Sequence, residues 1–565
     1  MSGASCNACA TSVIEPHANT QSGRGASARA RAMSQREPSA GSDQPCVGAV
    51  SDAPCFVTAR SAFGTGIAAF GHLNGLDTGY RSVLICPSVN RKSCGQGHLH
   101  AEFDDGRANR KGEPTMKQTQ KDYLDQLSQM ATATCLVDSS FYAKYDVKRG
   151  LRDITGKGVL AGLTQIGEVL SHTPSEEGDN KGPGCLIYRG IDIREIVSGF
   201  MSEGRCGFEE TAYLLLFGEL PKPDELERFT SLLFPYRTLP DDFVHDSILK
   251  LASRDIMNAM SQSVLALYTL DHEAEDTAIP NVLRQCLQLI AIFPMLAAYC
   301  YRTYAYRFQN KSLILHAPSL DLSTAGNFLR IFREDSVYTP LEEQTLDLAL
   351  VLHAEHGGGN NSSFTTHVVT SSGTDTYSAI TAALGSLKGP RHGGANIKVV
   401  QMFEEMKREV ADWESDSAIE AYLVKLVNKE AFDRSGLIYG VGHAVYSVSD
   451  PRTLILRDHV ERLAAEKGLA EEMELYRRVE RIAPEVIGGH RKMYKGVSAN
   501  VDFYSGFLYR LLNIPPELFT PLFAMARIVG WSAHRIEELA NGGKIIRPAY
   551  KSVAGRRHYV PLAER

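Results

Sequence analysis

Apolar residues at helical spacing recur along most of the chain from Met116 onward, and this pattern limits the fold more than any other feature. Side chains three and four residues apart share one face of a helix, so each such segment predicts a helix with a buried face. The segments are 208–218, 246–268, 279–308, 341–353, 377–387, 397–410, 419–428, 454–467, 473–482 and 519–538. Strand-like runs are short, and 185–189 is the clearest. Since an ordinary globular chain carries far more strand, the sequence predicts a mainly α fold.

Composition narrows the class of protein. The 565 residues are 43% hydrophobic and 22% charged, which allows a large core. A formal net charge of -6 gives no reason to expect nucleic acid as a partner. The 11 cysteines are odd in number and scattered, which favours a reducing compartment over a disulfide framework. The most apolar run, 287–300, is broken by Pro294, so we expect a buried helix and no membrane span.

Residues 1–116 differ from the rest of the chain. They are rich in serine, alanine, glycine and arginine, and acidic residues are sparse until Glu102. This composition predicts a low-complexity, disordered extension, and an arginine-rich segment poor in acids is typical of a transit peptide. We therefore expect a mitochondrial protein, with a cytoplasmic location as the alternative. An untargeted tail, or a true start at Met116, would explain the same composition.

The segment GPRHGGAN, residues 389–396, places His392 between a proline turn and two glycines. From Ile397 the apolar residues follow helical spacing, so His392 would stand beside a helix N-terminus. The free backbone N–H groups and the helix dipole there favour a neutral imidazole. Such a ring can donate a hydrogen bond to a carbonyl oxygen that gains negative charge. A loop histidine that only holds the turn is the structural alternative.

Two more histidines, His353 and His356, lie in LHAEHGGGNN, residues 352–361. On a helix their spacing of three would put them on one face, which raises the question of a metal site. The segment is not HExxH, however, and no third ligand is evident in the sequence. We therefore expect no metal and a histidine that orients a substrate.

His443 follows a glycine-containing loop, and Arg452 opens the next helix, which has Pro451 at its first position. Arg452 is within loop reach of His443, and a guanidinium is the expected partner of a substrate carboxylate. The structural alternative is that Arg452 pairs with Asp450 and that His443 is a packing residue.

Asp502 stands among apolar neighbours in NVDFYSG, residues 500–506. Burial would raise the pKa of this carboxyl and make it a useful base, whereas a helix N-cap is its structural alternative. Arg527 lies within an apolar helix and needs a charge partner, and Arg547 lies in a C-terminal loop. Together with His392 and His443, these groups suit proton abstraction beside a carbonyl of a polycarboxylate substrate.

Four segments carry a family resemblance. GPRHGGAN, GVGHAVYSVSDPR, NVDFYSG and FAMARIVGW stand in the order and context found in the citrate synthase family, which the chain resembles over roughly residues 142–550. LIYRG and LHAEH resemble the same family. The resemblance implies a mainly α homodimer with a large helical domain, 117–393 and 514–565, and a smaller mobile one, 394–513. The active site would lie between them, and closure would exclude water.

The resemblance also implies residue roles. Asp502 would take a proton from the methyl group of acetyl-CoA, while His392 hydrogen-bonds the thioester oxygen as the enol forms. His443 would polarise the carbonyl of oxaloacetate, and the resulting citryl-CoA is then hydrolysed. The substrate carboxylates would be bound by His356, Arg452, Arg527 and the partner subunit's Arg547. CoA contacts would come from Lys495, Gly440 and Gly442, and no cofactor is implied beyond the acyl-CoA substrate.

The chain departs from the family pattern at two positions. Ser447 stands where many members carry a cation that reaches CoA, and Gly357 replaces a frequent glutamate. LHAEHGGGNNSSF resembles a bacterial-type branch that contains both citrate and 2-methylcitrate synthases. We expect a citrate synthase that uses acetyl-CoA, with 2-methylcitrate synthase and propionyl-CoA as the nearest alternative. A non-catalytic CoA-binding homologue is the alternative of another class, and a metal-dependent hydrolase is a distant fourth.

Overall fold

The computed structural model describes residues 118–153, 157–172, 182–443, 445–446, 448–490 and 496–565. The predictions for the extension 1–116, for Ser447 and for Lys495 lie outside these residues.

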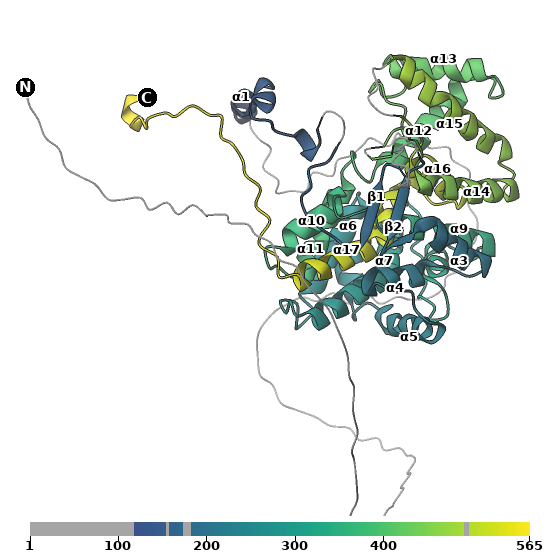
Figure 1. Cartoon of the computed structure of the whole chain (residues 1–565). Coiled ribbons are helices and arrows are strands. Elements are labelled where there is room, and N and C mark those ends of the chain that lie inside the picture. The colour runs from purple at the N-terminus through teal and green to yellow at the C-terminus, as the bar shows by residue number, and fades with distance from the viewer. Residues whose placement is uncertain (1–117, 154–156, 173–181, 444, 447, 491–495) are drawn as a thin grey trace, which may run out of the picture. The chain divides into compact units, whose positions relative to one another are not determined.

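Within them the chain forms 17 α-helices and three short strands (Figure 1). The first nine helices are α1 (Gln118–Cys135), α2 (Ser140–Lys144), α3 (Ile193–Ser202), α4 (Phe208–Phe217), α5 (Pro223–Leu233), α6 (Ile256–Tyr268), α7 (Ile279–Phe308), α8 (Thr324–Phe332) and α9 (Pro340–His353). The others are α10 (Asn361–Thr370), α11 (Thr376–Lys388), α12 (Ala395–Glu409), α13 (Asp416–Val427), α14 (Pro451–Glu466), α15 (Ala470–His490), α16 (Val501–Leu511) and α17 (Phe519–Ala540). The mainly α prediction is confirmed.

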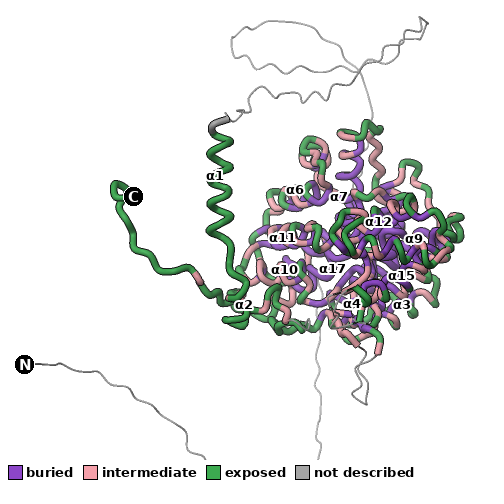
Figure 2. The backbone as a smooth tube through the Cα atoms, turned by 90° about the horizontal axis from the view of Figure 1, so that it is seen from above, coloured by how far each residue is buried: buried purple, intermediate pink, exposed green. Residues whose placement is uncertain are grey.

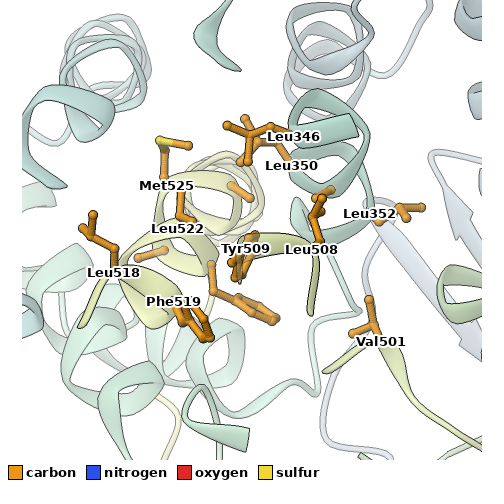
Figure 3. Packing of buried hydrophobic residues seen from close by; sticks show 14 of the residues in the cluster. Leu346, Leu350, Leu352, Val501, Leu508, Tyr509, Leu518, Phe519, Leu522 and Met525 are labelled. Carbon is orange, nitrogen blue, oxygen red and sulfur yellow. The ribbon is translucent and has the colours of Figure 1, made fainter. Parts of the chain in front are cut away.

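Helix α17 forms the centre of the core. It packs against α4, α6, α7, α9, α10 and α11, and every residue from Phe519 to Arg535 is buried (Figure 2). A helix that is buried on all sides has to be surrounded by other elements. Figure 3 shows leucine and aromatic side chains of α9, α16 and α17 gathered in this core: Leu346, Leu350, Leu508, Tyr509, Phe519 and Leu522. Polar groups on α17 are therefore held in fixed positions by dense packing.

A glycine on α17 allows its close approach to the segment that follows α9. A Cβ atom on Gly530 would lie 2.6 Å from the carbonyl oxygen of Ala354, closer than two such atoms can stand. Any larger side chain would push α17 away from this backbone. The contact places the segment around His356 directly against the central helix.

Helix α7 covers the predicted segment 279–308 and continues through Pro294. Proline removes one backbone hydrogen bond and usually costs about 3 kcal/mol in a helix interior. The packing of α7 against α6, α8 and α17 outweighs that cost. Among the described residues α7 alone is long and apolar enough to cross a bilayer, and 83% of its most apolar window is buried within the fold.

The predicted helix 246–268 is wrong in its first half. The chain forms a π-helical turn over Val244–Leu249, breaks, and begins α6 only at Ile256. Asp255 causes the restart, because its side chain accepts a hydrogen bond from the backbone N–H of Asn258 at 2.9 Å and caps the new helix. By contrast, α4 ends as predicted at Gly218, which adopts φ 89°.

Helices α12 to α16 pack among themselves. α13 contacts α15, and α16 contacts both α12 and α14. A Cβ on Gly506 of α16 would lie 2.8 Å from the carbonyl oxygen of Asn396 on α12, so these two helices meet closely at a glycine. The domain boundaries at 394 and 513 stay a prediction.

The strands β1 (Gly167–Leu170), β2 (Cys185–Tyr188) and β3 (Ile191–Asp192) form one antiparallel sheet in that order, with Gly167 opposite Tyr188. The sheet supports the segment after α9. The hydroxyl of Tyr188 lies 3.1 and 3.0 Å from the carbonyl oxygens of Val351 and Glu355, and it accepts a hydrogen bond from the Glu355 N–H. The backbone that carries His356 is thereby held from two sides.

Candidate active site

The structure brings six of the predicted site residues together. They come from the segment after α9, the α11–α12 turn, the loop before α14, the first turns of α14 and α16, and the centre of α17. The six are His356, His392, His443, Arg452, Asp502 and Arg527. Burial lowers the pKa of His356 most, and the charges of the nearby Arg452 and Arg527 lower it further.

His392 stands two residues before Gly394, the N-cap of α12, as predicted. A Cβ on Gly393 would lie 2.5 Å from the carbonyl oxygen of Leu387, so only glycine fits this turn. Burial, followed by the charge of Arg527, lowers the pKa of His392 to about 4. The ring is therefore neutral at physiological pH and can donate one hydrogen bond without carrying a charge.

Ser362 at the start of α10 orients that ring. Nε2 of His392 lies 3.2 Å from the Ser362 hydroxyl, which also accepts a hydrogen bond from the indole N–H of Trp531 at 3.1 Å. The one hydroxyl proton is thus free to point to His392 or to Asn360, whose side-chain oxygen is 3.0 Å away. When it points to His392, the ring carries its own proton on Nδ1, where a substrate oxygen can accept it.

His443 has a defined tautomer. Its Nδ1 accepts hydrogen bonds from the backbone N–H groups of Val445 and Tyr446, at 3.0 and 3.1 Å. A nitrogen that accepts two N–H donors carries no proton, so the proton of the neutral ring sits on Nε2. The ring stacks on Tyr446 at 4.5 Å and meets His356 edge-on at 5.2 Å. Nε2 of His443 is therefore a positioned donor beside His356.

His353 and His356 do not share a helix face, because α9 ends at His353. His353 is fully buried and stacks on Phe523 at 4.3 Å. His356 lies beyond the helix, and its buried Nε2 has no hydrogen-bond partner in the described part of the chain. A buried polar atom without a partner costs free energy, so His356 Nε2 is a site that a ligand would satisfy.

Arg452 is buried and forms a two-point contact with buried Asp450, Nε to Oδ1 at 3.0 Å and Nη2 to Oδ2 at 2.8 Å. The structural alternative for Arg452 is therefore observed. It does not compete with carboxylate binding, since a guanidinium has five N–H donors. Asp450 also accepts a hydrogen bond from the Val501 N–H at 3.3 Å and so ties Arg452 to the start of α16.

Among the described residues Arg527 forms no direct ion pair, although the charges of Glu355 and Asp502 act to raise its pKa. Its side chain is fully buried, and its Nε donates to the carbonyl oxygen of His353 at 2.6 Å. Within the described part of the chain, both buried Nη atoms have no hydrogen-bond partner. Burial lowers the pKa of Arg527 to about 10, which leaves it charged. A buried guanidinium with two unsatisfied nitrogens is a fork prepared for a carboxylate.

Asp502 is the second residue of α16, and the N-cap is Asn500, not Asp502. Asn500 accepts from the Asp502 N–H at 3.0 Å, which leaves the aspartate side chain free of the capping role. Oδ1 of Asp502 is buried without a hydrogen-bond partner. Burial raises its pKa to about 6, against the opposing charge of Arg452. A carboxylate with this pKa is a competent general base near neutral pH.

The predicted CoA-binding glycines have a visible structural role. Gly440 and Gly442 adopt φ of +78° and +104°. The Gly440 carbonyl accepts from the Asn500 N–H at 2.9 Å, and the Gly442 N–H donates to the Ser498 carbonyl at 2.7 Å. The loop that carries His443 is thus fastened to the strand-like segment before Asp502. Arg547 is exposed in the C-terminal tail and is not among the grouped residues of the single chain.

Ser362, Trp531 and Asn500 were missed as functional candidates. Trp531 had the clearest signal, because an indole N–H inside an apolar helix needs a nearby acceptor. That the acceptor is Ser362, 169 residues earlier, follows only from the packing of α10 on α17.

Comparisons with known proteins identify relatives of this chain. The family model for the citrate synthase C-terminal domain matches residues 153–549. The citrate synthase of Deinococcus radiodurans is 37% identical over 391 residues, which are 68% of this chain and 94% of that protein. The 2-methylcitrate synthase of Shewanella oneidensis is 31% identical over 73% of this chain and 99% of its own length.

A solved structure shows the same fold. The citrate synthase of Thermoplasma acidophilum, in ternary complex with carboxymethyl coenzyme A and oxaloacetate, aligns with a TM-score of 0.60 at 26% identity. The alignment covers 74% of this chain and 99% of that chain. On its sequence, its fold and the family match over most of its described length, this chain belongs to the citrate synthase family of acyltransferases.

Proposed function

We propose that the protein condenses acetyl-CoA with oxaloacetate and water to give citrate and CoA. The observation that supports this most is the pair of unsatisfied buried groups in one site. Among the residues that the structure describes, Arg527 presents two guanidinium nitrogens without hydrogen-bond partners, and Asp502 presents a carboxylate oxygen without one. A dicarboxylate substrate would accept hydrogen bonds from the Arg527 nitrogens. A substrate with an acidic C–H group would give a proton to the Asp502 carboxylate.

In the proposed reaction Arg527, Arg452 and His356 bind the carboxylates of oxaloacetate. His443 donates its Nε2 proton to a hydrogen bond with the oxaloacetate carbonyl oxygen. Asp502 removes a proton from the acyl methyl group, and the electron pair moves to the thioester oxygen, where neutral His392 stabilises it. The enol carbon then bonds to the polarised carbonyl carbon and gives citryl-CoA. Water cleaves the thioester and releases CoA, and no cofactor takes part beyond the two substrates.

The acyl preference is tested by comparing kcat/KM for acetyl-CoA and propionyl-CoA at fixed oxaloacetate. We expect acetyl-CoA to be favoured about 10-fold or more, in the range that one methylene supplies through pocket shape. A clear preference for propionyl-CoA would instead indicate a 2-methylcitrate synthase, which is the name of the 31% identical relative from Shewanella oneidensis. If both substrates bind and no CoA is released from either thioester, the protein is a non-catalytic homologue.

We further propose a homodimer in which the partner subunit's Arg547 completes each site. The support is the exposed apolar surface of the tail after α17, where Ile545, Tyr550 and Leu562 keep between 61% and 94% of their surface exposed to solvent. Large apolar side chains exposed in this way are typical of interfaces between subunits. Delivery to mitochondria stays a prediction that rests on the composition of residues 1–116.

Mixing two inactive variants tests the shared site. Asp502→Asn and Arg547→Gln should each lose most activity as homodimers. A purified mixed dimer should regain activity at one of its two sites, because that site holds an intact Asp502 and the intact Arg547 of the other chain. Activity is measured as CoA release by differentially tagged mixed dimers. If the mixed dimer stays inactive, Arg547 acts within its own chain, and if the Arg547→Gln homodimer keeps its activity, Arg547 is not part of the site.

A further inference from the structure

Two histidines and three glutamates form a cluster on the side of α17 that faces α10. His367 of α10 and His534 of α17 meet with their rings 4.8 Å apart, and Nε2 of His367 lies 3.1 Å from Nδ1 of His534. None of these groups takes part in the proposed reaction. The cluster touches the active site only through Glu355, the neighbour of His356.

Each histidine has a carboxylate at its other ring nitrogen. Nδ1 of His367 forms a hydrogen bond with Oε2 of Glu538 at 2.8 Å, whereas Nε2 of His534 and Oε1 of Glu355 form a 3.1 Å charge contact without hydrogen-bond geometry. Glu538 therefore holds the His367 proton on Nδ1, and the negative charge of Glu355 favours a proton on Nε2 of His534. When both rings are neutral in this arrangement, the two nitrogens that face each other, His367 Nε2 and His534 Nδ1, are left with lone pairs. Two lone pairs at 3.1 Å repel, so this place calls for a positively charged occupant.

A third ligand atom points to the same place. The N–H of Gln165 donates to Oε1 of Glu537 at 2.7 Å and fixes that carboxylate. Its other oxygen, Oε2, is buried without a hydrogen-bond partner and lies 3.7 Å from Nδ1 of His534. The ligand atoms of His367, His534 and Glu537 all lie within 4.8 Å of one another.

The space beside the two nitrogens is open because residue 358 is glycine. A Cβ on Gly358 would lie 3.4 Å from His367 Nε2 and 3.8 Å from His534 Nδ1. His534 is fully buried, whereas the His367 side chain keeps 12% of its surface exposed, so the cluster is reached from solvent at His367. A small ion can enter there, and a water can share the space that Gly358 leaves.

We propose that His367, His534 and Glu537 bind one divalent transition-metal ion, with Zn²⁺ as the best match. Two imidazoles and one carboxylate suit Zn²⁺ better than Mg²⁺ or Ca²⁺, which prefer oxygen ligands. Zinc bonds to nitrogen of about 2.0–2.1 Å put two tetrahedral ligands roughly 3.3 Å apart, close to the observed 3.1 Å. Glu538 orients the His367 imidazole through a hydrogen bond to Nδ1, as carboxylates do around many metal-bound histidines, and Glu355 places a negative charge beside Nε2 of His534.

The competing occupant is a proton. Burial lowers the pKa of His534, but Glu355 and Glu537 outweigh this effect and raise the pKa to about 9. An imidazolium at His534 would donate to His367 Nε2 and would also relieve the repulsion. The two occupants differ in what the protein takes up from solution, which a binding experiment distinguishes.

The test measures Zn²⁺ binding to the full-length protein after treatment with a chelator, by competition with a chromophoric chelator. Because the 11 cysteines of the chain can also bind Zn²⁺, occupancy of this site is measured as the Zn²⁺ bound by the wild type minus the Zn²⁺ bound by His367→Ala. We expect one Zn²⁺ per chain to be lost in His367→Ala. Glu538→Gln should keep the site but weaken it by about 10- to 100-fold. Co²⁺ in place of Zn²⁺ should show tetrahedral visible bands that also disappear in His367→Ala.

Two glycine variants guard against effects on folding. Gly358→Ala places a methyl group beside the two nitrogens at ordinary contact distance, so we expect a folded protein with weakened Zn²⁺ binding. Gly359→Ala is the matched control, since a Cβ there meets nothing within 4 Å and binding should be unchanged. The proposal is overturned if the wild type and His367→Ala bind equal amounts of Zn²⁺, or if both glycine variants bind like the wild type. Thiolate charge-transfer bands as the only Co²⁺ signal would also overturn it.

Discussion

Replacing Asp502 with asparagine should lower kcat by about 10²- to 10⁴-fold and leave oxaloacetate binding nearly unchanged. The amide keeps the size of the side chain but cannot take a proton from the acyl methyl group. In the wild type, kcat/KM should fall as the pH drops through about 6, because the carboxylate whose pKa burial raises to about 6 becomes protonated. Steady-state kinetics across pH, together with calorimetric binding of oxaloacetate, measure both effects.

The control for this variant is Asp458→Asn, which neutralises an exposed aspartate of α14 that pairs with Arg457. It should keep kcat within a factor of about two, since exposed ion pairs contribute little. Asp502→Asn should also be at least as stable as the wild type at pH 8, because an ionised carboxylate is no longer buried there. A near-normal kcat for Asp502→Asn would show that another group is the base.

The second large effect is expected for Arg527→Met, which should raise the KM for oxaloacetate by about 30-fold to several thousand-fold. This range corresponds to the roughly 2–5 kcal/mol lost when one partner of a buried charged pair is truncated. Oxaloacetate should raise the melting temperature of the wild type and not that of the variant. Without ligand, the variant should melt no lower than the wild type, because it no longer buries two guanidinium nitrogens without partners.

Arg535→Met is a matched control on the same helix. Arg535 is also fully buried, but its guanidinium donates to Thr376 Oγ1, Thr370 Oγ1 and the carbonyl oxygen of Thr374 at 2.9–3.2 Å. Its removal leaves acceptors unpaired, so Arg535→Met should lower the melting temperature and leave the KM for oxaloacetate unchanged. If Arg527→Met, like Arg535→Met, lowers the melting temperature and leaves the KM for oxaloacetate unchanged, Arg527 has a structural role and does not bind the substrate.

Helix periodicity allowed most of the fold to be predicted, and the errors have local causes. Helices such as α7 and α17 appear in the sequence because each buries residues at regular spacing. The break before Ile256 was missed because a single capping aspartate outweighed the apolar pattern. The continuity of α7 through Pro294 agrees with the predicted segment 279–308, and tertiary packing, which a sequence does not display, offsets the lost hydrogen bond.

The residue types of the site were also visible in the sequence, since histidines and aspartates beside glycines are an unusual use of those residues. Their protonation states were not. The tautomer of His443 depends on two backbone N–H groups that its loop turns back toward Nδ1. The contact of His392 with Ser362 and Trp531 joins three separate elements. Such contacts join residues that are far apart in the sequence, so no sequence spacing predicts them.

The sequence by itself determined the helical class, the positions of most helices and the residues of the site, because all three follow from side-chain chemistry and its local spacing. Only the tertiary structure decided which charges are left without partners. Arg452 pairs with Asp450, whereas the two Nη atoms of Arg527 have no hydrogen-bond partner among the described residues. It also decided that His367 and His534, 167 residues apart, face each other with their ring nitrogens at 3.1 Å. Burial makes such groups costly, and that cost is what a ligand relieves.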